Sequence, residues 1–79
     1  MLTSNQISKA IKVKYGIAGV MVYVGGGMCS FYSDTNEEAG SVICSGDHGV
    51  SVCRINHLSL ESWLEEFYEM WQRNSVILN

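Results

Sequence analysis

The amino-acid sequence predicts an α+β protein, with an N-terminal helix, a four-stranded antiparallel sheet arranged as a meander, and a C-terminal helix, in the order αββββα. Three observations support this prediction. Apolar residues recur at helical spacing near both ends of the chain, short runs of β-branched and aromatic residues fill its middle, and glycine-containing turns separate those runs. The 79 residues suit one domain, which we assign to residues 1–79.

The first helix is predicted near the N-terminus, in the stretch TSNQISKAIKVKY. Thr3 and Gln6 have the spacing of a capping box, in which two side chains satisfy backbone amides at the start of a helix. Ile7 and Ile11 then lie on one face. The end of this helix is not defined by the pattern, because IKVKY alternates like a strand before Gly16 interrupts it.

A first hairpin is predicted from VMVYV and MCSFYS, which flank three consecutive glycines. Gly25, Gly26 and Gly27 fit a three-residue hairpin loop with positive φ angles. The same glycines lack the features of a nucleotide-binding loop. A P-loop continues with Lys and Ser or Thr, and a dinucleotide fingerprint opens a helix rather than a strand. We therefore interpret the three glycines as a turn.

A second hairpin is predicted from SVICS and VSVCRIN around the turn sequence GDHG, after the polar connection DTNEEAG. Within it Cys44-x3-His48 is followed by Cys53-x3-His57, and two cysteines with two histidines could supply four zinc ligands, although the usual C-x2–4-C spacing of zinc sites is absent. In the predicted hairpin the two histidines lie roughly 25 Å apart, too far for one ion. Cys44 lies only diagonally across from Cys53, which disfavours a disulfide. We therefore expect no metal site and no cofactor, and a metal or thiol protein is the less favoured alternative.

The C-terminal helix is predicted from LSLESWLEEFYEMWQRN. Ser59 is a suitable N-cap and Asn74 a suitable C-cap, and one broad face between them is apolar. The predicted core joins this face to residues of the other elements: Ile7, Ile11, Val22, Val52, Ile55, Leu60, Trp63, Leu64, Phe67 and Trp71.

The opposite face of this helix carries the first candidate site. Glu65, Glu66 and Glu69 point away from the apolar stripe, and Glu65 and Glu69 are like charges at i,i+4 spacing, which costs about 0.2–0.5 kcal/mol. A solvated face is one interpretation of such a cluster. The functional interpretation is a docking surface for a protein partner with a basic surface.

The first hairpin carries the second candidate site, because both of its faces are apolar. With a three-residue loop, Tyr23 and Phe31 share one face. If both helices cover the other face, Tyr23 and Phe31 are exposed and mark an interface. This surface is also the basis of an alternative function, a homodimeric structural or assembly module.

Composition and charge argue against several classes of function. The formal net charge is −3, with eight acidic residues against five lysines and arginines, which argues against direct binding of nucleic acid. No segment approaches the ~20 apolar residues of a membrane span, and the N-terminus lacks the apolar core of a signal peptide. We expect a soluble cytoplasmic protein that does not bind membranes.

The odd cysteine count predicts free buried thiols at Cys29, Cys44 and Cys53. No catalytic constellation is evident, so we predict that the protein is not an enzyme.

A tiny acidic domain with a small sheet and an acidic helix bearing tryptophan resembles the small anti-CRISPR inhibitors encoded by phages. The stretch LESWL, Leu60 to Leu64, is similar to the start of a helix in an inhibitor of type I-F systems. The resemblance implies stoichiometric binding to a Cas subunit and competition with nucleic acid at a basic cleft. It therefore predicts a non-enzymatic, phage-encoded inhibitor that acts in the host cytoplasm.

Overall fold

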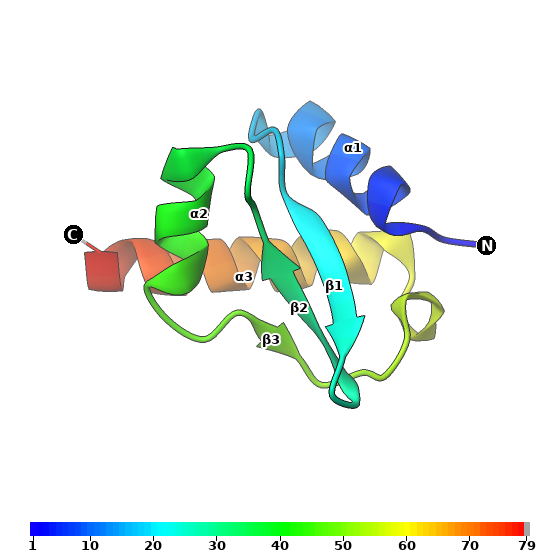
Figure 1. Ribbon diagram of the computed structural model, residues 1–79. Coiled ribbons are helices and arrows are strands. Elements are labelled where there is room, and N and C mark those ends of the chain that lie inside the picture. Colours follow the sequence, from blue (N-terminus) through cyan, green and yellow to red (C-terminus); the bar gives the residue numbers. More distant parts are fainter. Residues whose placement is uncertain (79) are drawn as a thin grey trace.

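Residues 1–78, which the computed structural model describes, form three α-helices and a three-stranded antiparallel sheet (Figure 1). In chain order the elements are α1 (Ser4–Tyr15), β1 (Met21–Gly25), β2 (Met28–Tyr32), α2 (Glu37–Cys44), β3 (Gly49–Val50), the short 3-10 helix η1 (Ile55–His57) and α3 (Leu60–Leu78). The strand order is β1-β2-β3. The predicted α+β class is confirmed. The four-stranded meander and the order αββββα are wrong, because α2 replaces one of the predicted strands.

The sheet has one covered and one uncovered face. Figure 1 shows α3 running across the back of the sheet, with none of the helices in residues 1–78 across its front. α1 contacts β1 and α3, and α2 contacts β2 and α3. The outer edge of β1 is partly protected by α1, because the Val22 amide donates to Ser4 Oγ at 2.9 Å.

The start of α1 follows the prediction. The Gln6 amide donates to Thr3 Oγ1 at 3.2 Å, and the Thr3 amide donates to Gln6 Oε1 at 2.8 Å, so the capping box is confirmed. The stretch that alternates like a strand continues as helix to Tyr15. Gly16 ends it with φ of 73°, and its amide donates to Lys12 O at 2.9 Å.

The turn between β1 and β2 contains two residues rather than the predicted three. Gly26 and Gly27 have φ of 63° and 80°, as in a type I′ turn, and Gly25 pairs with Met28. A change of one residue in the loop moves every side chain of the second strand to the other face. Phe31 therefore lies opposite Val22 and faces the helices, whereas we predicted it on the same face as Tyr23.

The predicted second hairpin is not formed. SVICS lies at the end of α2, which begins after Asn36, whose side chain accepts from the Ala39 amide at 3.2 Å. Ala39 and Ile43 are buried at i,i+4 spacing, so packing determines helix where local propensity favours strand. From GDHG onward, the strand that pairs with β2 is Gly49–Val50, which begins at the last glycine of that turn sequence.

The structure confirms most of the predicted core residues. Ile7, Ile11, Val22, Trp63, Leu64 and Phe67 are buried, and Val52, Ile55 and Trp71 pack against them while partly exposed. Leu60 was wrongly predicted in the core, because 36% of its surface is exposed. Phe31 packs edge-on against both Trp63 and Phe67, and Trp63 Nε1 donates to Ile55 O at 2.7 Å.

The helix α3 begins as predicted but extends further. The Ser62 amide donates to Ser59 Oγ at 3.2 Å, which confirms Ser59 as the N-cap. Asn74 is not a C-cap but a fully buried residue inside the helix. Its Nδ2 donates to Ile43 O at 3.0 Å and to Asp47 O at 3.2 Å, so it connects α3 to α2 and the following loop.

Candidate functional site

The acidic residues predicted on α3 do not form one uniform surface. Glu65 and Glu69 are exposed and line a shallow hollow of about 490 Å³ together with Lys14, Tyr15 and Tyr68. Glu66 is half-buried and does not line this hollow. The structure thus brings two of the three predicted carboxylates to one site, at the junction of α3 with the end of α1.

Aromatic rings form a fixed surface beside these carboxylates. Tyr15 and Tyr68 stack with centroids 5.5 Å apart and an interplanar angle of 15°. The Tyr15 hydroxyl donates to Leu64 O at 3.4 Å, and Gln72 Nε2 donates to the Tyr68 hydroxyl at 2.7 Å. Neither tyrosine was predicted to belong to a binding site. The signal for Tyr15 was its position four residues after Ile11, on the same helix face.

The hollow also carries a positive charge, which the sequence analysis did not assign to it. Lys14 Nζ lies 5.6 Å from the centroid of the Tyr15 ring, a cation–π geometry, and Lys14 lines the hollow with Glu65 and Glu69. The site is therefore mixed in charge rather than uniformly acidic.

A second hollow adjoins the first along the seam between α1 and α3, and the two share Lys14. It measures about 470 Å³ and is mainly apolar. Its lining comprises Leu2, Gln6, Lys9, Ala10, Val13, Lys14, Leu60 and Leu64. Val13 is 78% exposed, so this helix seam presents apolar surface to solvent. We call the two hollows together the α1–α3 groove.

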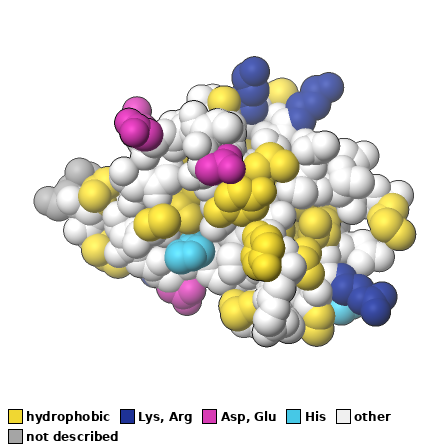
Figure 2. Space-filling view, viewed as in Figure 1, with side chains coloured by type: hydrophobic (Ala, Val, Ile, Leu, Met, Phe, Trp, Pro, Cys, Tyr) yellow, Lys and Arg dark blue, Asp and Glu magenta, His cyan; other side chains and the backbone are white. Residues whose placement is uncertain are grey.

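The uncovered face of the sheet carries a separate apolar patch. Tyr23 is 61% exposed, Met28 and Tyr32 are each 39% exposed, and Met21 is half-buried. Figure 2 shows apolar side chains gathered over β1 and β2 on this face. We call these four residues the sheet patch.

Glycines let two of these side chains lie along the sheet. A Cβ on Gly25 would overlap the Tyr23 ring, and a Cβ on Gly49 would overlap the end of Met28. Tyr23 is exposed as predicted. Phe31 has no exposed surface, so its predicted role as an exposed partner-binding residue is wrong, and Tyr32 occupies the uncovered face instead.

The thiols differ in their surroundings. Cys29 is buried, and burial raises the pKa of its thiol, with a further increase from nearby Cys53. Cys44 and Cys53 are exposed, contrary to the prediction that all three thiols are buried. Within residues 1–78 no three or more Cys, His, Asp or Glu side chains are grouped so that they could hold a metal ion.

Comparisons of this chain with protein-family models, with curated proteins and with solved structures gave no significant match. In the part of the chain that the structure describes, no helix combines the length and the apolar character needed to cross a bilayer.

Proposed function

We propose that this protein is a non-enzymatic inhibitor that binds a basic surface of a protein target through the α1–α3 groove. The observation that carries this proposal is the exposure of Glu65 and Glu69 at the edge of an open groove, beside the stacked rings of Tyr15 and Tyr68. Rigid aromatic surface supplies contact area, and the two carboxylates on the α3 side of the groove select a partner with lysines or arginines opposite them. Lys9 and Lys14 on the α1 side repel such side chains, so the basic residues of the partner would meet α3.

The class of target follows from the basic surface that would be complementary to these carboxylates. Basic clefts that grip nucleic-acid phosphates present clustered lysines and arginines, and occupying one blocks the nucleic acid. The resemblance to small phage-encoded anti-CRISPR proteins makes a Cas subunit in the host cytoplasm the first target to test. The protein would then act by stoichiometric binding.

A phage infection assay tests this target class. Bacteria that carry an active CRISPR–Cas system and a matching spacer are infected after the chain has been expressed. We expect plaque formation by the targeted phage to rise in at least one system of a panel that covers the known types. No rise in any system, with the chain expressed and folded, would contradict the Cas assignment.

Two pairs of variants test the groove once a target is available. Glu65→Gln with Glu69→Gln removes two charges inside the groove. Asp34→Asn with Glu61→Gln removes two exposed charges outside its lining and serves as the matched control. We expect the first pair to weaken binding at least fivefold, chiefly through the association rate, and the control to change it less than twofold. Equal effects of both pairs would mean that net charge, not the groove, controls binding.

A second candidate function, a homodimeric assembly module, is favoured by the sheet patch. The patch consists of exposed apolar side chains on a sheet face that no helix of residues 1–78 covers. A standard interface buries about 800 Å² per partner, so a dimer would need the surroundings of the patch as well. Light scattering during size-exclusion chromatography decides this candidate. A dimer that Tyr23→Ser dissociates would support it, and a monomer at high concentration would exclude it.

A further inference from the structure

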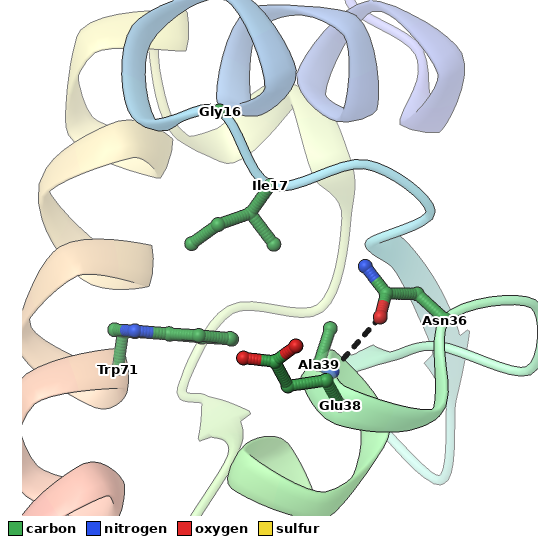
Figure 3. Close-up of a pocket in the computed structure, with 6 residues that line it drawn as sticks. All are labelled: Gly16, Ile17, Asn36, Glu38, Ala39 and Trp71. Atoms are coloured by element: carbon green, nitrogen blue, oxygen red, sulfur yellow. Dashed lines mark hydrogen bonds between the residues drawn. The ribbon is translucent and has the colours of Figure 1, made fainter.

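A third cavity lies apart from the groove, where three helices meet. It is bordered by the C-terminal end of α1, the N-terminal end of α2 and the side chain of Trp71 on α3 (Figure 3). Its volume is about 130 Å³, and it is lined by Gly16, Ile17, Asn36, Glu38, Ala39 and Trp71. None of these residues lines the α1–α3 groove.

The size of the cavity restricts what can occupy it. Sites for drug-sized ligands measure roughly 300–1,000 Å³, whereas a cavity of about 150 Å³ admits benzene. At about 130 Å³ this cavity suits one small planar group. A single side chain of a partner protein meets that requirement.

The walls of the cavity favour a flat group. Figure 3 shows the indole ring of Trp71 on one side and the side chain of Ile17 on the other, with the space between them. The Trp71 ring is held in place by Phe67, whose ring centroid lies 5.4 Å away. A planar group that enters between Ile17 and Trp71 would therefore stack on a fixed aromatic face.

The charges around the cavity favour a cation. In Figure 3 the carboxylate of Glu38 points toward the Trp71 ring, and Glu38 is the one ionisable side chain of the lining. The two helix ends on the cavity carry opposite partial charges: Gly16 lies at the carbonyl end of α1, which is partly negative, and Asn36 lies at the amide end of α2, which is partly positive. The full charge of the lining is therefore that of Glu38. The face of an indole ring also attracts cations.

The other polar side chain of the lining is already engaged. Asn36 Oδ1 accepts from the Ala39 amide at 3.2 Å, and its Nδ2 donates to Ala18 O at 2.7 Å. Figure 3 places the ring nitrogen of Trp71 at the end of the indole farther from Glu38. The polar side-chain group that faces an incoming ligand is therefore the carboxylate of Glu38.

We propose that this cavity is a binding site for an arginine side chain of a partner protein. The guanidinium stacks between Ile17 and the indole face of Trp71 and pairs with the Glu38 carboxylate. Arginine fits better than lysine because its guanidinium is planar, stacks on aromatic rings and binds a carboxylate through two parallel hydrogen bonds. The site goes beyond the proposed function, because it shares no residue with the groove and can bind arginine whatever the target is.

An NMR titration of the full chain with a small probe tests the site directly. N-acetyl-arginine-N-methylamide is added to the ¹⁵N-labelled protein, and backbone amide and indole shifts are followed. We expect saturable shifts confined to the amides of residues 16–17 and 36–39 and to the indole of Trp71, with a millimolar dissociation constant. The citrulline analogue has the same shape without the charge, and we expect it to bind at least fivefold more weakly. The lysine analogue should bind more weakly than arginine as well.

Two variants at neighbouring positions distinguish binding in the cavity from general attraction of arginine to acidic residues. Glu38→Gln should weaken arginine binding at least fivefold, whereas Glu37→Gln, an exposed residue of the same helix turn outside the cavity lining, should change it less than twofold. Both changes remove one charge from the first turn of α2, so both affect folding alike. Absence of shifts in this region, equal shifts with citrulline, or an equal response of the two variants would each overturn the proposal. None of these results would bear on inhibition through the groove.

Discussion

The ring of Phe31 meets the indole of Trp63 edge-on, with 5.8 Å between the ring centroids and an interplanar angle of 88°. Both side chains are fully buried. This contact joins β2 to α3 and shows which face of the first hairpin points inward. Tyr32, the next residue along β2, points to the uncovered face and is 39% exposed.

The hairpin register predicts that two adjacent aromatic residues differ strongly in their contribution to stability. Phe31→Ala should lower the free energy of unfolding by about 3–5 kcal/mol, because it removes a buried ring and leaves a cavity. Tyr32→Ala should lower it by less than about 1.5 kcal/mol, because the ring is partly solvated. Urea unfolding followed by circular dichroism measures both. A larger loss for Tyr32→Ala would mean that the opposite face is the buried one.

The two-residue turn predicts how Gly26 tolerates substitution. Its φ of 63° lies in the left-handed region, and a Cβ there would meet no atom within 4 Å. Gly26→Val should therefore destabilise by about 1–2 kcal/mol through backbone strain alone. Gly26→Asn should be close to neutral, because Asn-Gly is the preferred sequence of a type I′ turn. Thermal unfolding of the two variants checks this ranking, and equal melting temperatures would contradict it.

The buried side-chain amide of Asn74 predicts how substitutions at this position change the free energy of unfolding. Its Nδ2 donates to Ile43 O and Asp47 O, while its Oδ1 has no hydrogen-bond partner within the described residues. Asn74→Ala should cost about 1–3 kcal/mol, because it removes the donor from the buried Ile43 carbonyl, whereas the Asp47 carbonyl still accepts from Arg73 Nη2 at 2.9 Å. Asn74→Asp should cost more at neutral pH, since it places a carboxylate beside two carbonyl oxygens.

Urea unfolding at neutral and acidic pH measures the Asn74 variants. The difference in unfolding free energy between wild type and Asn74→Asp should become smaller as the pH falls and the buried carboxyl becomes protonated. Asn5→Ala, at an exposed position of α1, is the control and should be neutral or slightly stabilising. If Asn74→Ala is equally neutral, the two hydrogen bonds contribute nothing to stability.

The buried thiol of Cys29 predicts a dependence of stability on alkaline pH. Burial raises its pKa above the usual 9.0, so the thiol ionises at lower pH in the unfolded chain than in the folded one. The stability that this difference contributes is complete below pH 9.0 and is lost as the pH rises through the higher folded pKa. The stability advantage of wild type over Cys29→Ala should therefore be constant from neutral pH up to the unfolded pKa of 9.0 and shrink as the pH rises above it. Urea unfolding across this range measures the advantage, and a constant difference would contradict the prediction.

Local sequence signals predicted where the first and the last helix begin. The capping box of Thr3 and Gln6 and the N-cap Ser59 identify the starts of α1 and α3, because a cap depends on residues that are close in sequence. The apolar stripe of α3 likewise identified Trp63, Leu64 and Phe67 as core residues. Exposure of Glu65 and Glu69 on the opposite face follows from the same helical periodicity.

Contacts between residues far apart in the sequence determined the structural features that local signals did not predict. A short apolar segment such as SVICS suits a strand or a helix, and contact of α2 with α3 and β2 selects the helix. One residue more or less in a glycine turn exchanges the faces of a strand, so Phe31 is in the core and Tyr32 on the surface. The groove beside Tyr15 and the cavity between Ile17 and Trp71 each join residues from different helices. The sequence by itself determined where α1 and α3 begin and which of their faces are apolar, because those properties depend on neighbours along the chain. Only the tertiary structure decided which residues of different elements meet, because that depends on how distant segments fill a shared core.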